Sequence, residues 1–356
     1  MSARDRRVPI SDVARHTDRI DVRSPAEFAL DHLPRAVNAP VLDDAERARV
    51  GTLHAQASAF EARKAGAAIV ARNIAAIVDT LARDKPIDWS PLVYCWRGGQ
   101  RSRSLAHVLG EIGFGAVQLE GGYRAFRRHV VEALAARPAG LRFVVIGGLT
   151  GTGKSRLIAA LAAEGAQVLD LERLARHRGS LLGDDPHNPQ PSQKAFETGI
   201  YDALERVDPK EPVFVESESR RIGRLQLPPA LLDAMRASAC LRLDSARALR
   251  IELLMEEYAH LCADPAALDA RLAPLAPLVG NDSLARWHDA AAAGEFATLV
   301  DELLSQHYDP VYARSIDGNY PQLASAPVLT ARAIDATAFA ALARRAVATA
   351  REAFKG

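Results

Sequence analysis

Short apolar runs alternate with amphipathic segments along residues 8–136. A short apolar run bounded by turn-forming residues is typical of a buried strand, whereas apolar residues three and four positions apart indicate a helix. These patterns predict strands at 19–22, 37–40, 92–95 and 116–119, and helices at 26–32, 67–81, 102–112 and 123–136. Strands that alternate with helices in this way predict a parallel sheet covered by helices.

A second alternation begins after residues 137–140, where Pro138 and Gly140 interrupt the helical pattern. The expected elements are strands at 143–146, 168–170 and 213–216, a helix at 154–164, and mostly helices from about residue 246 onward. We therefore expect an α/β protein with one domain over 8–137 and a second over 141–245. A helical C-terminal region over 246–356 is expected to pack on the second domain.

The composition is that of a globular chain, with 48% hydrophobic and 25% charged residues. No apolar run approaches the roughly 18 residues of a spanning helix, and the charged N-terminus lacks the apolar segment of a signal peptide. The three cysteines, Cys95, Cys240 and Cys262, are too few and too widely spaced for a disulfide framework or a zinc site. We therefore expect a cytoplasmic protein with no membrane partner.

The net charge of +1 conceals an uneven distribution. Residues 1–140 hold 21 basic and 16 acidic side chains, whereas the remainder holds 24 basic and 28 acidic ones. A weak net field does not attract a polyanion over a long range. If nucleic acid binds, the charge pattern predicts a few local basic contacts and not a broad basic face.

The segment Cys95–Ser102 (CWRGGQRS) lies between a predicted buried strand and a predicted helix. A neighbouring arginine and a helix N-terminus both favour the reactive thiolate. The two glycines would let the loop curl so that its backbone N–H groups point inward and bind an anion. We predict Cys95 as a nucleophile, and Cys240 and Cys262 as core residues. The expected donors and anion-binding residues of the loop are Arg97, Arg101, Trp96, Gly98, Gly99, Gln100 and Ser102.

A second loop, Gly148–Ser155 (GLTGTGKS), fits the pattern G-x4-G-K-S between a predicted strand and a predicted helix. Backbone N–H groups of such a loop cradle phosphates, a lysine reaches the terminal ones, and a serine ordinarily binds Mg²⁺. Nucleotide and other diphosphates would both suit this cradle. The predicted phosphate-binding residues are Gly148, Thr150, Gly151, Thr152, Gly153, Lys154 and Ser155.

Acidic residues at strand ends are candidates for an acid or a Mg²⁺ ligand. Asp170 and Glu216 end two predicted strands, and Glu218 would lie on the same side as Glu216 if its strand continues. A solvated strand-end carboxylate is the alternative interpretation of each.

Basic clusters are candidates for contacts with nucleic-acid phosphates, although each alone is also typical of a solvated helix face. Aromatic residues near the cysteine loop, chiefly Trp96 and also Tyr94 and Tyr123, are candidates for stacking on a base. The basic candidates are Arg124, Arg127, Arg128, Arg176, His177, Arg178, Arg220 and Arg221.

Several segments of the first domain resemble rhodanese domains. DVRSPAEF at 21–28 and HLPRAVN at 32–38 are similar to their opening signature, and LEGGY at 119–123 is similar to their closing strand and turn. The cysteine loop falls where that family carries its persulfide-forming cysteine. The five residues between Cys95 and Arg101 match the spacing of the related dual-specificity phosphatases, although Tyr94 replaces the histidine that those enzymes carry. This spacing suggests a substrate with a tetrahedral phosphorus group.

Over roughly residues 8–310, the chain resembles the tRNA 2-selenouridine synthase family, in which a rhodanese-like domain precedes a P-loop NTPase-like α/β domain. The segments that carry this resemblance are YCWRGGQRS at 94–102, GLTGTGKS at 148–155, DLERLARHRGSLLG at 170–183 and FVESESRRIG at 214–223. The resemblance implies an enzyme that replaces the sulfur of wobble 2-thiouridine by selenium in the tRNAs for Lys, Glu and Gln. It implies selenophosphate and geranyl diphosphate as co-substrates, S-geranyl-2-thiouridine as an intermediate, and tRNA and selenophosphate synthetase as partners.

The resemblance also implies roles for the two loops. Cys95 would carry selenium as an S-selanyl group, while the arginines and amides of its loop hold the phosphate. The loop at 148–155 would hold the diphosphate of the prenyl donor, with Mg²⁺ on Ser155. Two alternatives stay open: a C-x5-R cysteine phosphatase or sulfurtransferase, and a P-loop kinase or NTPase whose rhodanese module is non-catalytic.

Overall fold

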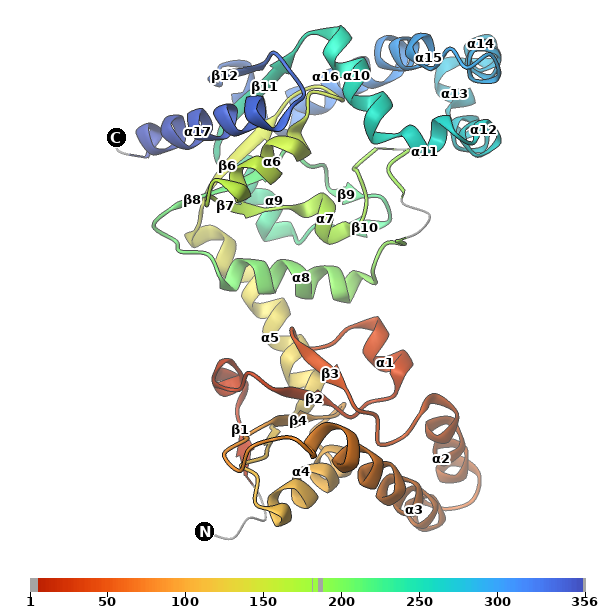
Figure 1. Cartoon of the computed structure of the whole chain (residues 1–356), viewed down its shortest axis with the longest axis vertical. Helices are drawn as coiled ribbons and strands as arrows, with labels where there is room; N and C mark the ends of the chain where they lie inside the picture. The colour runs from red at the N-terminus through yellow and green to blue at the C-terminus, as the bar shows by residue number, and fades with distance from the viewer. Residues whose placement is uncertain (1–5, 181, 185–187, 355–356) are drawn as a thin grey trace. The chain divides into compact units, whose positions relative to one another are not determined.

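The computed structural model describes residues 6–180, 182–184 and 188–354, and the chain divides into two compact units (Figure 1). Unit 1 comprises Met1–Ala133 with Pro191–Asp202, and unit 2 comprises Leu134–Gln190 with Ala203–Gly356. The division therefore falls inside helix α5 (Gly122–Ala136), just before the boundary expected at 137–140. The segment 191–202 lies inside the predicted second domain but belongs to unit 1.

Contacts of helix α8 (Gln193–Glu205) explain this assignment. Thr198 donates a hydrogen bond from Oγ1 to Oδ2 of the buried Asp31 at 3.1 Å. Arg127 of α5 forms an ion pair with Glu197. These polar contacts join the start of α8 to unit 1, and no local sequence pattern encodes them.

Unit 1 is built on a five-stranded parallel sheet with the strand order β1-β5-β4-β2-β3. The strand β4, which leads into the cysteine loop, is central in this sheet. The strands are β1 (Arg7–Val8), β2 (Arg19–Asp21), β3 (Ala36–Asn38), β4 (Leu92–Tyr94) and β5 (Val117–Leu119). The helices are α1 (Pro25–Leu30), α2 (Asp44–Gln56), α3 (Ala59–Ile77), continued by η3 (Val78–Ala82), α4 (Gln100–Ile112) and α5.

The helix Ala59–Ala82 is long and apolar enough to span a membrane, judged by length and composition alone. No such segment was predicted from the apolar runs of the sequence. Ile74, Ile77 and Ala82 of this helix pack in the core of unit 1 with Ile20 and Val93 of the sheet. The helix therefore serves as a layer on the sheet, although part of its surface is exposed.

Unit 2 contains a second five-stranded parallel sheet, with the order β12-β11-β6-β8-β7. The strand β6 is central, and the chain leaves it toward β7 at one edge and returns later to β11 on the other side. Ligands of such sheets bind at the carboxyl ends of the strands where the order reverses. The strands are β6 (Arg142–Gly147), β7 (Gln167–Leu169), β8 (Pro212–Glu216), β11 (Ala239–Ser245) and β12 (Val328–Ala331), and a hairpin adds β9 (Arg221–Ile222) and β10 (Leu225–Gln226).

The C-terminal region is less uniformly helical than predicted. Its strand β12 completes the sheet beside β11, and α17 (Ala336–Ala353) packs on it through Phe339 and Leu342. The other C-terminal helices enclose a separate apolar core around Trp287. The helices of this unit are α6 (Lys154–Ala163), α7 (Leu171–Ala175), α9 (Pro229–Arg236), α10 (Arg247–Glu257), α11 (Ala259–Cys262), α12 (Pro265–Leu272), α13 (Ala276–Val279), α14 (Asn281–Ala292), α15 (Phe296–Leu303), α16 (Asp309–Asn319) and α17.

Candidate functional site

The Cys95 sulfur lies at the carboxyl end of β4 and directly below the N-terminus of α4. Its Sγ accepts hydrogen bonds from the Gly99 backbone N–H and from the Ser102 hydroxyl, both at 3.2 Å. The positive end of the helix dipole and these two donors all favour a negative charge on sulfur. The side chain is 3% exposed, so a substrate must reach it through the mouth of the loop.

The closing turn at 121–123 holds the cysteine loop in place. The Tyr123 N–H donates to the Cys95 carbonyl at 2.8 Å. Gly122 has a φ of +57°, and a Cβ there would lie 2.2 Å from the same carbonyl oxygen. Of the two loop glycines, Gly98 adopts a φ of +65°, whereas Gly99 has a φ of −95° and open space beside it. Gly98 and Gly122 are thus the positions where the loop requires glycine.

Gln118 is a buried polar residue of β5 that the sequence analysis missed. Its Nε2 donates to the Ser102 hydroxyl at 2.7 Å and to the Gly99 carbonyl at 2.9 Å. Ser102 is thereby oriented so that its own proton points to Cys95. A glutamine inside an otherwise apolar strand was the signal that could have identified it.

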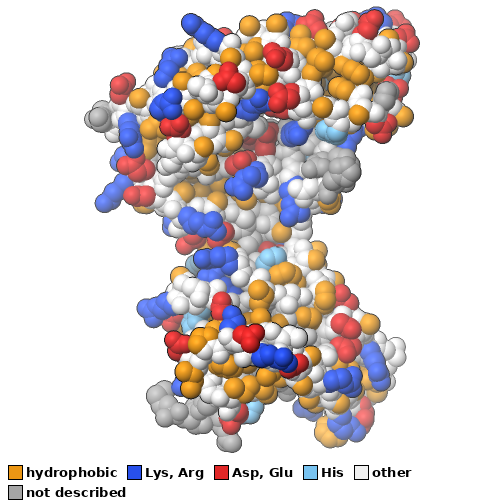
Figure 2. All heavy atoms as spheres, in the orientation of Figure 1, with side chains coloured by type: hydrophobic (Ala, Val, Ile, Leu, Met, Phe, Trp, Pro, Cys, Tyr) orange, Lys and Arg blue, Asp and Glu red, His pale blue; other side chains and the backbone are white. Residues whose placement is uncertain are grey.

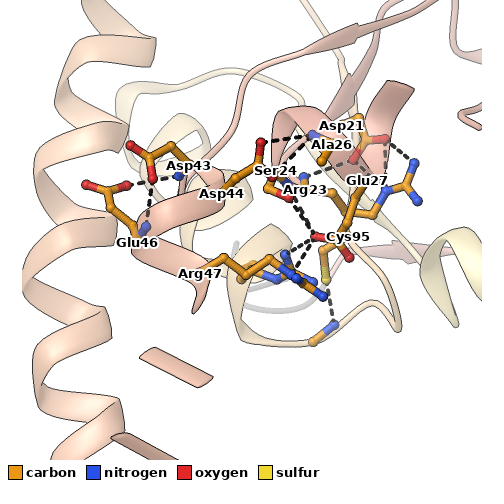
Figure 3. Close-up of polar contacts among 12 residues, drawn as sticks. Asp21, Arg23, Ser24, Ala26, Glu27, Asp43, Asp44, Glu46, Arg47 and Cys95 are labelled. Atoms are coloured by element: carbon orange, nitrogen blue, oxygen red, sulfur yellow. Dashed lines mark hydrogen bonds and ion pairs between the residues drawn. The ribbon is translucent and has the colours of Figure 1, made fainter. Parts of the chain in front are cut away.

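Glu27 of α1 contacts two arginines, of which Figure 3 labels Arg47. Its Oε2 accepts from Arg101 at 3.0 Å and pairs with Arg47 at 3.1 Å. Burial raises the pKa of Glu27, but Arg101, Arg47 and the Ser24 N–H together lower it by more, so the carboxylate stays ionised. Arg97 is exposed and, among the described residues, its guanidinium has no hydrogen-bond or ion-pair partner. Of the two predicted donors, Arg97 is therefore the one free to meet an anion without breaking an ion pair.

The aromatic residues near the loop differ in what they expose. Tyr94 and Tyr123 are buried, and the Tyr123 hydroxyl donates to Asp31 at 2.7 Å. Arg23 lies over the Tyr123 ring at 4.0 Å. The prediction that these two tyrosines stack on a base is therefore wrong, because their faces are covered. Trp96 is half-buried and stacks on Tyr123 with 5.3 Å between ring centroids, which leaves it as the aromatic candidate.

The second loop, Gly148–Ser155, joins β6 to α6 at the reversal point of the sheet. Lys154 donates from Nζ to the loop carbonyls of Gly148 and Leu149 at 2.8 and 3.2 Å. Burial lowers the pKa of Lys154, but Tyr312 and nearby carboxylates raise it by more, so the group stays charged. The loop, α10 and α16 border a cavity of about 480 Å³. A charged lysine and helix-terminal amides facing such a cavity suit a phosphate group.

Three carboxylates gather beside this loop: Glu172, Glu216 and Glu218, with one oxygen of each within 4.8 Å of the others. Ser155 donates from Oγ to Glu172 at 2.7 Å. Both carboxylate oxygens of Glu216 are buried and lack a hydrogen-bond partner among the described residues. Burial and the neighbouring carboxylates raise the pKa of Glu216, and raise that of Glu218 to about 8. An orphaned carboxylate within a set of oxygen ligands fits Mg²⁺.

The fold places only one of the two predicted acids, Asp170 and Glu216, in this carboxylate cluster. Glu216 lies in the carboxylate cluster, whereas Asp170 caps α7 by accepting the Arg173 N–H at 2.9 Å and is not a member of it. Glu172 was missed, because its place beside Ser155 depends on how α7 follows β7 in three dimensions.

The predicted tRNA contacts also separate into two groups. His177 is buried and pairs with Asp184 at 3.3 Å, and Arg127 is held by Glu197. Neither is available to a large ligand as placed. The remaining predicted residues are exposed: Arg124, Arg128, Arg176, Arg178, Arg220 and Arg221.

Arg221 lines an open cavity of about 750 Å³ in unit 2, together with Arg224 and Arg271. Gly179 and Ser180 border both this cavity and the one beside the phosphate loop. Basic and acidic side chains are otherwise interspersed on the face shown in Figure 2. A local cluster of arginines, and not a broad basic face, therefore lies next to the phosphate site.

Known proteins match both parts of the chain. The family description "Rhodanese-like domain" matches residues 11–129, and "tRNA 2-selenouridine synthase AAA domain" matches residues 141–269. These matches and the two parallel sheets confirm the predicted α/β fold.

Relatives named tRNA 2-selenouridine synthase align over most of the sequence. The protein of Sulfurovum sp. is 36% identical over 253 residues, which cover 69% of this chain and 67% of that one. Those of Cupriavidus pinatubonensis and Salmonella newport are 34% and 31% identical, cover 83% and 85% of this chain, and are themselves covered to 88% and 89%. The chain belongs to the tRNA 2-selenouridine synthase family.

Proposed function

We propose that this enzyme of tRNA modification converts wobble 2-thiouridine to 2-selenouridine in the tRNAs for Lys, Glu and Gln, with selenophosphate as the selenium donor. The observation that carries the proposal is the cysteine loop of a family member, in which Cys95 faces a helix N-terminus and two hydrogen-bond donors. We expect the reaction to occur in the cytoplasm, with selenophosphate synthetase as the source of the donor.

In the selenium step, the Cys95 thiolate attacks selenium, and the Se–P bond breaks with its electron pair leaving on phosphorus. The Gly99 amide and the Ser102 hydroxyl, now 3.2 Å from sulfur, favour the thiolate before the attack. Arg97, being unpaired, receives the phosphate part of the donor. Cys95 then carries selenium as an S-selanyl group. The terminal selenium attacks C2 of the base, and the C2–S bond breaks with its electron pair leaving on the geranyl thiolate. A thiol reductant then attacks the Cys95 sulfur and cleaves the S–Se bond, which releases 2-selenouridine and leaves a mixed disulfide on Cys95 that a second thiol reduces.

An activation step prepares the base for this exchange. Geranyl transfer from geranyl diphosphate to the C2 sulfur makes that sulfur a better leaving group. We place the diphosphate on Gly148–Ser155, where Lys154 and the amides at the start of α6 stabilise the departing charge. Ser155 and the three glutamates beside it would hold Mg²⁺, which neutralises charge on the diphosphate. A nucleotide would compete for the same cradle, so the affinities for geranyl diphosphate and ATP distinguish the two.

The arginines of the 750 Å³ cavity support a place for tRNA. Arg221 and Arg224 are exposed, and the cavity shares Gly179 and Ser180 with the phosphate site. Backbone phosphates around the wobble base would pair with these side chains, and the base would enter beside Lys154. The few contacts predict a modest salt dependence of tRNA affinity.

The experiment is mass spectrometry of wobble nucleosides from cells that express each variant in place of the native protein. Cys95→Ala should abolish 2-selenouridine and leave S-geranyl-2-thiouridine, whereas Lys154→Ala should deplete both. Cys240→Ala, a change at a cysteine far from either loop in sequence, is the matched control and should leave the nucleosides unchanged. Selenation that survives Cys95→Ala would refute the proposal, and hydrolysis of aryl phosphates without tRNA would favour a phosphatase.

A further inference from the structure

An apolar pocket in the helical part of unit 2 adjoins the phosphate-loop cavity. The two cavities share five lining residues: Thr150, Ser180, Leu254, Tyr258 and Tyr308. The pocket has a volume of about 50 Å³. Its interior is lined mainly by aliphatic and aromatic side chains of α10, α12 and α15, among them Leu254, Met255, Leu268, Phe296, Leu299 and Val300.

The polar groups at this pocket are confined to its mouth. The Ser180 hydroxyl lies 3.0 Å from the Tyr258 hydroxyl, and the Arg178 guanidinium lies 5.0 Å from the centre of the Tyr258 ring. Behind this mouth, Leu268 and Leu299 belong to the core around Trp287. A void in an apolar core costs stability unless something fills it. A ligand that fills both the phosphate-loop cavity and the apolar pocket needs a charged head for the loop and a hydrocarbon tail for the pocket.

We propose that this pocket binds the distal part of the hydrocarbon tail of the diphosphate donor and limits the length of that tail. The inference rests on the proposed function, in which the diphosphate lies on Gly148–Ser155. The 480 Å³ cavity beside Lys154 has room for the diphosphate and the first five-carbon unit. The 50 Å³ pocket accepts about three to five water-sized groups, comparable to the five carbons of one further isoprene unit. A third unit would find no room.

Two residues of the lining allow the pocket to be filled or widened. Val300 is half-buried on α15, and phenylalanine in its place would occupy the pocket. Thr298 has nearly the same shape and lies on the same helix, but it is exposed and does not line the pocket, so Thr298→Phe is the matched control. Met255→Ala would remove a flexible side chain and lengthen the pocket.

The test is calorimetric titration of the full chain in Mg²⁺ with pyrophosphate and with dimethylallyl, geranyl and farnesyl diphosphates. Burial of five more carbons should make geranyl diphosphate bind roughly tenfold or more tightly than dimethylallyl diphosphate. Farnesyl diphosphate should bind no more tightly than geranyl diphosphate. Val300→Phe should abolish the higher affinity for geranyl diphosphate over dimethylallyl diphosphate but leave the affinity for pyrophosphate unchanged. Thr298→Phe should behave as wild type. Met255→Ala should increase the affinity for farnesyl diphosphate and leave the other affinities unchanged.

Cys262 provides a second readout, because it lines the pocket, whereas Cys240 does not. Geranyl diphosphate should slow alkylation of Cys262, as read by peptide mass spectrometry, and pyrophosphate should not. Equal affinities for all four ligands, or a Val300→Phe variant that keeps the geranyl gain, would overturn the pocket assignment. In that case pyrophosphate binding that is lost in Lys154→Ala would still support the proposed function. Absence of any Lys154-dependent diphosphate binding would overturn both.

Discussion

The carboxylate cluster predicts that the metal-free protein loses stability as pH rises through neutrality. Glu218 has a folded-state pKa of about 8, against an ordinary value of 4.5. Between these values the folded state keeps a proton that the unfolded state has released. The stabilisation that this proton provides is therefore fully present below about pH 4.5 and is lost as pH rises toward 8.

The magnitude follows from the number of protons involved. One proton held only by the folded state changes the free energy of unfolding by about 1.4 kcal/mol per pH unit. From about pH 6 to about pH 7.5, Glu218 alone should lower it by about 2 kcal/mol. For a unit of this size, that corresponds to a fall in melting temperature of about 4 to 8 °C. Glu216, whose pKa is also raised, should add to this effect.

Differential scanning calorimetry of the full chain in EDTA measures this dependence, and the transition that pyrophosphate raises identifies unit 2. Glu218→Gln cannot ionise, so its melting temperature should fall less over the same pH range. The exposed Glu252 of α10 supplies the control Glu252→Gln, which should retain the wild-type slope. Saturating Mg²⁺ should stabilise the wild type most at the higher pH, because metal binds the ionised carboxylates. A wild-type melting temperature independent of pH, or an unaltered slope in Glu218→Gln, would refute the reasoning.

Three further predictions concern the cysteine loop and the arginine cluster. Gly122→Ala should reduce selenation by about a hundredfold or more, because its Cβ would lie 2.2 Å from the Cys95 carbonyl oxygen. Gly99→Ala should be tolerated, because the space beside Gly99 is open. Nucleoside mass spectrometry compares the two variants, and equal activities would contradict the geometry. Gln118→Leu should slow alkylation of Cys95 severalfold, since Ser102 loses its orienting partner, and an unchanged rate of iodoacetamide labelling would argue against this role. Arg221→Glu with Arg224→Glu should weaken tRNA binding at least tenfold and reduce its salt dependence in filter-binding assays, while leaving pyrophosphate affinity intact.

The sequence identified the parts of the site that consecutive residues encode. Both loops follow a strand and begin a helix, so their local patterns sufficed to place Cys95 and Lys154. Glu172 was missed because it reaches Ser155 only after β7 and α7 have folded beside β8. Gln118 was missed for the same reason, since its partners precede it by more than a dozen residues.

The fold was predicted where the hydrophobic period was regular and missed where tertiary contacts decided. No element was predicted for the segment that forms β11, and β12 lies in the region that was expected to be mostly helical, although both strands pair in the second sheet. The start of α8 joined unit 1 through Asp31, a buried carboxylate whose partner Thr198 lies far along the chain. The tyrosines beside the cysteine loop were wrongly predicted to stack on a base. They lie near the loop in the sequence, but the sequence does not show that their ring faces are covered.

The most direct test of the central claim is the mass of the peptide that contains Cys95 after the purified protein meets selenophosphate. The account predicts that this peptide gains one selenium atom, and that the selenium is lost when S-geranylated tRNA and a thiol reductant are added and appears as 2-selenouridine at the wobble position. Ser102→Ala should reduce the rate of this gain, since it removes one of the two donors to sulfur. Formation of 2-selenouridine without any selenium on Cys95 would contradict the account.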